Sequence, residues 1–174
     1  HVEQVCDRLR KEGYDATRYH AGLSDAERRR NQDDFQFDRA KVMVATNAFG
    51  MGIDKSNVSF VVHYNMPKNL ESYYQEAGRA GRDGSPADCV LLYSGQDVIT
   101  ARWMLDHADE NPDLTSDEQE AIYRRDQERL KQMTFYSTSR RCLRGFILNY
   151  FGEKAPERCD NCSVCAGAPF EPDR

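Results

Sequence analysis

Residues 41–55 read KVMVATNAFGMGIDK. A short apolar run from Val42 to Ala45 is followed at once by polar and glycine-rich residues. Such a run predicts a buried strand. In open parallel sheets the ligand binds where strands end, so the loop that begins at Thr46 is a candidate ligand loop. A simple tight turn between a strand and a helix is the alternative.

The segments on either side of this stretch alternate between strand and helix patterns. Ser24 to Glu27 reads as a capping box that opens a helix. The expected helices are 2–12, 24–37 and 69–77, and the expected strands are 16–19, 41–46, 58–64 and 89–93. Strands that alternate with helices of about ten residues are typical of an α/β fold, with a parallel sheet flanked by helices on both faces. We predict a parallel sheet of this kind.

The pattern changes near residue 95, where we place a domain boundary. Residues 96–107, 117–135 and 138–151 have helical patterns, and the last two predict a helical hairpin. We expect a first domain over residues 1–95 and a helical second domain over 96–168. Residues 169–174 show no pattern and are expected to be a frayed tail.

Composition limits the possible classes of protein. The chain has 174 residues, 39% of them hydrophobic, and a net charge of −5. It has no apolar stretch of membrane-spanning length and no signal-peptide pattern at its start. Without an initial Met, and opening directly into a helical pattern, the sequence is expected to be a fragment.

The charge is unevenly distributed. Residues 97–120 carry eight acids and one base, and residues 121–145 carry seven bases and two acids. The basic segment could meet a phosphate backbone. A solvated helix face explains the same charges, and charge alone favours that interpretation.

Four of the six cysteines have the spacing of a metal site. Sixteen residues separate Cys142 from Cys159, and Cys162 and Cys165 follow at Cys-x-x-Cys intervals. This pattern predicts a structural zinc site with four thiolates, with an iron–sulfur cluster as runner-up and free core thiols as the remaining alternative. Cys6 and Cys89 stand alone in apolar segments and are expected to be core residues. With no secretion signal, such cysteines indicate a reducing compartment.

A second candidate site is QEAGRAGRDG, residues 75–84. Arg79 and Arg82 are spaced three apart among glycines, so that both guanidinium groups could reach a phosphate. In the loop after residue 45, Thr46 and Asn47 could also bind phosphate, and Asp54 could accept a hydrogen bond from a ribose hydroxyl. Solvated surface loops are the alternative for these segments. An anion could also bind near His20 and Gly22, although His20 fits a packed loop residue equally well.

These motifs together resemble those of the RecQ family of DNA helicases. The resemblance rests on residues 19–23, 44–55, 63–67 and 73–84 and on the cysteine spacing, and it spans residues 1–166. It implies the second RecA-like lobe of the motor followed by the family's zinc-binding subdomain. It also implies an ATP-driven enzyme that tracks 3′ to 5′ on single-stranded DNA and separates duplexes. The implied location is the bacterial cytoplasm, with the nucleoid, or the eukaryotic nucleus, with no membrane partner.

The resemblance also assigns roles to residues. Arg82 would be the arginine finger, Arg79 a second phosphate contact and Gln75 a coupling residue. Gly52 and Asp54 would lie near the nucleotide. The residues placed toward the DNA backbone would be His20, Gly22, Thr46, Asn47 and Met51. The implied zinc ligands would be Cys142, Cys159, Cys162 and Cys165.

One part of the family pattern is missing. The sequence has no Gly-x-x-x-x-Gly-Lys-[Ser/Thr] loop and no Asp-Glu-x-His segment, so ATP and Mg²⁺ would be held mainly by another lobe of the same polypeptide. We therefore expect the 174-residue chain to be inactive as an ATPase on its own. An RNA helicase lobe of the same superfamily and a non-catalytic, zinc-stapled nucleic-acid-binding module are the alternative interpretations.

Overall fold

The computed structural model describes residues 1–46, 49, 55–109 and 111–167. It divides the chain into two compact units, each of which is described by itself. The first consists of His1–Ser59 and Arg79–Ala87, and the second of Phe60–Gly78 and Asp88–Arg174. None of the described helices is both long enough and apolar enough to cross a lipid bilayer.

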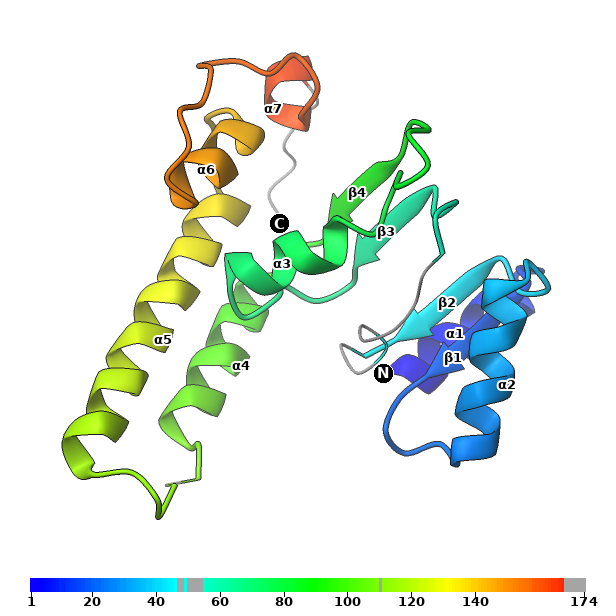
Figure 1. Cartoon of the computed structure of the whole chain (residues 1–174), viewed down its shortest axis with the longest axis horizontal. Coiled ribbons are helices and arrows are strands. Elements are labelled where there is room, and N and C mark those ends of the chain that lie inside the picture. Colours follow the sequence, from blue (N-terminus) through cyan, green and yellow to red (C-terminus); the bar gives the residue numbers. More distant parts are fainter. Residues whose placement is uncertain (47–48, 50–54, 110, 168–174) are drawn as a thin grey trace. The chain divides into compact units, whose positions relative to one another are not determined.

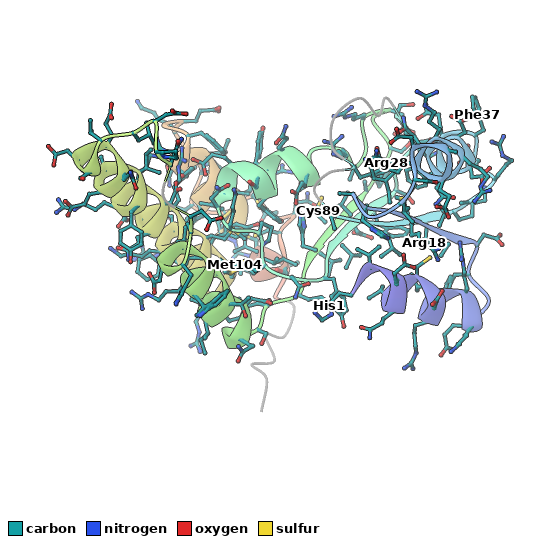
Figure 2. All side chains as sticks on the ribbon, turned by 90° about the horizontal axis from the view of Figure 1, so that it is seen from below. His1, Arg18, Arg28, Phe37, Cys89 and Met104 are labelled. Carbon is teal, nitrogen blue, oxygen red and sulfur yellow. The ribbon has the colours of Figure 1, made fainter. Side chains whose placement is uncertain are left out.

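The first unit is built on a pair of parallel strands. Strand β1 (Ala16–Tyr19) pairs with β2 (Val42–Ala45), with Ala16 opposite Val42. Helices α1 (Val2–Lys11) and α2 (Asp25–Gln36) lie on opposite faces of this pair (Figures 1 and 2). Helix α2 begins where the sequence predicts, because the Ser24 hydroxyl accepts a hydrogen bond from the Glu27 N–H. Cys6 on α1 is fully buried, as expected.

The second unit also contains a parallel strand pair. Strand β3 (Phe60–His63) pairs with β4 (Asp88–Leu91), and helix α3 (Leu70–Ala77) connects them in the chain. Helices α4 (Gly95–Asp106) and α5 (Ser116–Ser137) run side by side (Figure 1). Helix α6 (Leu143–Tyr150) and the short helix α7 (Ser163–Ala166) follow. The predicted parallel strands with flanking helices are therefore present, as two pairs of strands.

A single hydrophobic core connects α3 to the long helix α5. Its buried members are Met66, Leu70, Tyr73, Leu130, Met133 and Tyr136, and residues of α6 pack against them. Leu70 and Met133 are fully buried. Helix α3, which leads into the arginine segment, is therefore packed against the helices that lead into the cysteine cluster.

Two predictions from the sequence were wrong. The last long helix does not start at residue 138: residues 139–142 are not helical, and α6 begins at Leu143 with Cys142 as its N-cap. This break in the helix lets the Cys142 sulfur face the other cysteines. Cys89 is not a core residue, since it lies on β4 with an exposed side chain whose Sγ is 3.5 Å from the Ala77 carbonyl oxygen (Figure 2).

Candidate functional site

The arginine segment follows directly from helix α3 and is held by backbone hydrogen bonds. Gly78 caps α3, and residues 78–83 form successive turns. The Gly81 N–H donates to the Val58 carbonyl at 2.9 Å, and the Asp83 N–H donates to the Ser56 carbonyl at 3.3 Å. These bonds place the arginine segment beside residues 56–58, which follow the glycine-rich stretch in the sequence.

Glycine is required at position 81. Gly81 has φ +66°, and a Cβ atom there would lie 2.9 Å from the Ser85 carbonyl oxygen and 3.2 Å from the Ala87 Cβ. A side chain at this position would force the turn or its neighbours Ser85 and Ala87 to shift. Arg79, on one side of this turn, is half-buried, whereas Arg82 and Gln75 are exposed.

A partly buried pair in the second unit holds the end of α3. His63 is 8% exposed, and its Nε2 lies 2.9 Å from the Glu76 Oε2. The His63 ring also contacts the Tyr73 ring, with 4.9 Å between centroids. Glu76 stands next to Gln75 in the chain, so this contact orients the helix turn that carries Gln75. Sequence analysis gave no role to Glu76.

Lys55, the first described residue after the glycine-rich stretch, is held by an acid and an aromatic ring. Lys55 is 7% exposed, its Nζ lies 2.8 Å from the Asp38 Oδ1, and it sits over the Phe35 ring at 5.2 Å from the centroid. The hydrogen bond from Lys55, and a second from Asn57, lower the pKa of the Asp38 carboxyl. A lysine directly after the candidate ligand loop is the only sequence signal for this ion pair, which was not predicted.

The predicted DNA-facing residues are partly described. Thr46 is exposed at the end of β2, where its N–H donates to the Tyr19 carbonyl at 3.1 Å. His20 is held in its loop, with Nε2 2.7 Å from the Glu3 Oε1 and Nδ1 accepting from the Gly22 N–H at 3.2 Å. The other predicted residues of the loop, Asn47, Met51, Gly52 and Asp54, lie outside the described residues.

The four predicted zinc ligands come together. The sulfurs of Cys142, Cys159, Cys162 and Cys165 all lie within 4.8 Å of one another. A tetrahedral site with Zn–S bonds of about 2.3 Å has sulfur–sulfur edges of roughly 3.8 Å. The observed cluster is therefore close to the size that a zinc ion requires, and no other group of three or more possible metal ligands is found in the described part of the chain.

Backbone N–H groups point at these sulfurs. The Gly145 N–H donates to Cys142 at 3.3 Å, the Cys162 N–H to Cys159 at 3.3 Å, and the Leu143 N–H to Cys162 at 3.4 Å. Such donors stabilise a thiolate over a thiol, and the thiolate is the form that binds metal.

The ionisation of the cluster fits a metal site. Burial alone would raise the pKa of Cys162, but hydrogen bonds from the N–H groups of Cys165 and Leu143 and from the Cys165 and Cys159 thiols together lower that pKa to about 6. For Cys142, the Gly145 N–H lowers the pKa, whereas burial and the neighbouring Cys159 and Cys165 thiols raise it to about 11. Four adjacent thiolates repel one another, so a divalent cation would offset that repulsion. The donor set fits zinc, which prefers four thiolate ligands in a closed structural site.

Comparisons with known protein families match two consecutive regions of the chain. Residues 1–84 match the helicase conserved C-terminal domain, and residues 95–166 match the RecQ zinc-binding domain. The chain belongs to the RecQ family. The cysteine cluster thus lies within the RecQ zinc-binding region, and the arginine segment ends the helicase C-terminal region.

Several relatives of this RecQ chain have helicase names. ATP-dependent DNA helicase RecQ of Bacillus subtilis is 47% identical over 164 residues, which is 94% of the chain and 26% of that protein. The Haemophilus influenzae protein of the same name is 44% identical over 99% of the chain and 26% of its own length. A relative from Acanthamoeba polyphaga mimivirus, provisionally named an ATP-dependent RNA helicase, is 43% identical over 86% of the chain and 26% of its length. The chain thus spans about a quarter of these relatives.

Solved structures support the RecA-like fold. A DEAD box protein from the hyperthermophile Methanococcus jannaschii aligns with a TM-score of 0.50 and 26% identity, over 60% of this chain and 29% of that one. Saccharomyces cerevisiae Dbp5, solved with Gle1 and IP6, aligns with a TM-score of 0.50 and 25% identity, over 74% of this chain and 36% of that one.

Proposed function

We propose that this chain is the C-terminal part of the motor of an ATP-dependent DNA helicase, in which Arg82 acts as the arginine finger. The observation that carries the proposal is the pairing of Gly81 and Asp83 with Val58 and Ser56. It holds the arginine segment next to residues 56–58, which follow the glycine-rich stretch in the sequence, and this supports the assignment of both segments to one nucleotide site. The RecQ membership and the names of the bacterial relatives point the same way.

The proposed chemistry is phosphoryl transfer from ATP to water. ATP and Mg²⁺ are bound mainly by the other RecA-like lobe, and the metal neutralises charge on the phosphates. This chain supplies Arg82 to the charge that develops on the transferred phosphoryl group and Arg79 as a second phosphate contact. Gln75 couples the site to the DNA, while Gly52 and Asp54 lie against the nucleotide.

In this proposal, the protein moves along the DNA strand because these phosphate contacts are lost after hydrolysis. Attraction between the guanidinium groups and the γ-phosphate closes the two lobes, and hydrolysis with product release removes that attraction. If the strand is held differently in the two states, each cycle moves the protein along it. The proposed contacts to the DNA backbone come from His20, Gly22, Thr46, Asn47 and Met51. Because they are contacts to phosphates, we expect little sequence preference.

The metal centre has a structural role in this proposal. Cys142, Cys159, Cys162 and Cys165 would hold Zn²⁺ with no open coordination position. The ion would connect the start of α6 to the turn at α7, in a part of the chain with few buried residues.

Replacement of the finger in the full-length enzyme tests the mechanism. We expect Arg82→Ala to bind ATP nearly normally but to lose on the order of 10³-fold or more of its turnover. Arg8→Ala is the control, because Arg8 is an exposed α1 residue whose guanidinium lies near Glu12. Near-normal turnover in Arg82→Ala would refute the assigned role.

The direction of unwinding and the activity of the isolated chain need separate measurements. We expect the full-length protein to unwind duplexes with a 3′ single-stranded tail and to leave those with only a 5′ tail intact. The isolated 174-residue chain is expected to show no ATP turnover, because it supplies only half of the site. Turnover by this chain alone, or preference for 5′ tails, would contradict these two expectations.

An RNA helicase is the second candidate, favoured by the name of the mimivirus relative. Unwinding assays with matched 3′-tailed DNA and RNA duplexes separate the two activities. A full-length protein that binds nucleic acid but hydrolyses no ATP would instead favour a zinc-stapled binding module.

A further inference from the structure

The Glu3 carboxylate connects helix α1 to the loop that follows β1. Its Oε1 lies 2.7 Å from the His20 Nε2, and its Oε2 lies 2.9 Å from a guanidinium nitrogen of Arg18 on β1, the strand that leads into that loop. The side chains are partly buried, with Glu3 46%, His20 21% and Arg18 27% exposed. Salt therefore screens these contacts less than it screens a fully exposed pair. The proposed function leaves Glu3 without a role.

The His20 ring is held at both of its nitrogens. The Gly22 N–H donates to Nδ1 at 3.2 Å, so Nδ1 is the acceptor and carries no proton in this arrangement. The ring proton is then on Nε2, which donates it to the Glu3 carboxylate. Glu3 therefore selects both the tautomer and the orientation of the ring that holds Gly22.

The position of the His20 ring sets the course of the loop of residues 20–23. A Cβ atom at Gly22 would lie 3.1 Å from the His20 Nδ1 and 3.3 Å from its Cε1, so the ring packs directly against the Gly22 backbone. The Leu23 N–H donates to the His20 carbonyl at 3.2 Å and closes the turn. If the ring rotated away, the Gly22 N–H would lose its partner. The loop therefore depends on a carboxylate that lies 17 positions before His20 in the chain.

The charge of Glu3 argues against a direct contact with phosphates. A carboxylate repels a phosphate strand, and this one is half-exposed beside a loop that we expect to face DNA. Arg18 balances the charge of Glu3. Charge alone would therefore make Glu3 neutral or harmful to strand binding, and the contribution that remains for it is to orient His20.

We propose that Glu3 is a positioning residue for strand binding, which acts by holding His20 and, through it, the loop of residues 20–23. The proposal rests on the proposed function, in which His20 and Gly22 face the DNA backbone. It also makes the role of His20 more specific. Because both ring nitrogens are engaged within the protein, the ring shapes the loop, and the backbone of the loop is what meets the phosphates.

The test uses the full-length protein and measures binding of a fluorescent single-stranded DNA to Glu3→Ala. We expect binding to be roughly three- to tenfold weaker, because the loop loses the hydrogen bond that holds His20. Charge alone predicts the opposite sign, since the loss of an acid favours binding of a polyanion. In ATP turnover, the DNA concentration that gives the half-maximal rate should rise by a larger factor than the maximal rate falls. Unchanged or tighter binding by Glu3→Ala would overturn the proposal.

Glu12→Ala is the matched control, because Glu12 is an exposed acid at the end of α1 that pairs with Arg8. It removes the same charge, and its affinity for the strand should equal or slightly exceed that of the wild type. Glu3→Gln is the conservative variant, since the amide oxygen still accepts a hydrogen bond from the His20 Nε2. It should recover most of the affinity that Glu3→Ala loses. Equal losses in Glu3→Ala and Glu3→Gln, or in Glu3→Ala and Glu12→Ala, would overturn the proposal.

A double-mutant cycle decides whether Glu3 acts through His20. His20→Ala removes the ring, so Glu3→Ala should cause no further loss of affinity in that background. Losses that multiply in the double variant would mean that Glu3 acts by another route, and the proposal would fail.

The same assays distinguish this proposal from the proposed function. A wild-type protein that neither binds the strand nor turns over ATP would contradict the proposed function. A wild-type protein that does both, with Glu3→Ala identical to it, would contradict only the role of Glu3.

Discussion

The hydroxyl of Tyr73 on α3 lies 3.1 Å from the hydroxyl of Tyr136 on α5, and both side chains are only 5% exposed. Their rings are also in contact, with centroids 5.1 Å apart, and Tyr136 meets Phe146 of α6 at 5.7 Å. Tyr136 is therefore the point where α3, α5 and α6 meet. It joins the helix before the arginine segment to the helices before the cysteine cluster.

The first prediction concerns this hydroxyl pair. Tyr136→Phe keeps the ring and the packing but leaves the buried Tyr73 hydroxyl without its described partner. We expect a loss of about 1 kcal/mol in the free energy of unfolding. Urea unfolding of the variant and the wild type measures it, with Tyr14→Phe as control because Tyr14 is 57% exposed. An unchanged midpoint for Tyr136→Phe would mean that the hydroxyl pair contributes nothing to stability.

The second prediction concerns the metal. Cys162→Ser removes one of four ligands and should reduce bound zinc from one equivalent to well below one, because a three-thiolate site holds the ion less tightly. Metal analysis of the purified protein measures the zinc content. Cys89→Ser is the control, since Cys89 lies on β4 outside the cluster and should keep a full equivalent.

Removal of zinc with a chelator should destabilise the protein, as Cys162→Ser should. Metal bound only by the folded form stabilises it, so removing zinc should expose residues 138–167 to protease before residues 1–46. Well-folded wild-type protein that contains no zinc would contradict the four-thiolate assignment.

The third prediction concerns the turn between the two arginines. In Gly81→Ala the new Cβ would face the Ser85 carbonyl at 2.9 Å, in a backbone conformation with φ +66°. We expect a loss of roughly 1–3 kcal/mol in stability and, in the full-length protein, a larger loss of ATP turnover than of ATP binding. The turnover effect follows because the bond from Gly81 to Val58 positions the arginine segment.

Gly84→Ala provides a matched control for this turn. Gly84 has φ +84°, but a Cβ there would meet nothing within 4 Å. Both variants therefore carry the cost of a left-handed backbone, and only Gly81→Ala adds the steric contact. Equal effects in the two variants would show that crowding against Ser85 is unimportant.

Local sequence signals predicted most of the elements. The Ser24 cap, the helix that follows it and the strand before Thr46 all depend on neighbouring residues, and the structure reproduces them. The cysteine cluster was also predictable, because the Cys-x-x-Cys spacing brings three of its four sulfurs together within one short segment. The prediction was wrong where contacts between residues far apart in the sequence determine the structure. Helix α6 starts late because Cys142 has to meet Cys159, Cys162 and Cys165.

The residues that support the candidate site were not predictable in the same way. Tyr136 is 63 positions from Tyr73, and the bond from Gly81 to Val58 joins segments that are separated by α3 and β3. Helical periodicity marks Tyr136 only as one apolar position among several. Hydrogen bonds of this kind depend on how elements pack, which hydrophobic pattern alone does not specify.

The last prediction concerns the ion pair between Lys55 and Asp38. Asp38→Asn would leave the Lys55 ammonium group, which is 7% exposed, without an opposite charge, whereas Lys55→Met removes the buried charge and keeps an apolar stem. An unpaired buried charge is the more costly defect, so we expect Asp38→Asn to destabilise the protein more than Lys55→Met. The comparison also avoids a backbone effect, because Asp38 has φ +60° and asparagine tolerates that conformation.

The same pair has a defined pH dependence. The hydrogen bond from Lys55 lowers the folded-state pKa of Asp38, so its stabilising effect is present above the ordinary aspartate pKa of about 3.9. It is lost as the pH falls through the lower, folded-state value. Urea midpoints between pH 7 and pH 2.5 should therefore fall less steeply in Asp38→Asn than in the wild type. The Asp38→Asn/Lys55→Met double variant should be more stable than Asp38→Asn alone. If the double variant instead loses as much unfolding free energy as the two single variants together, the two groups do not interact.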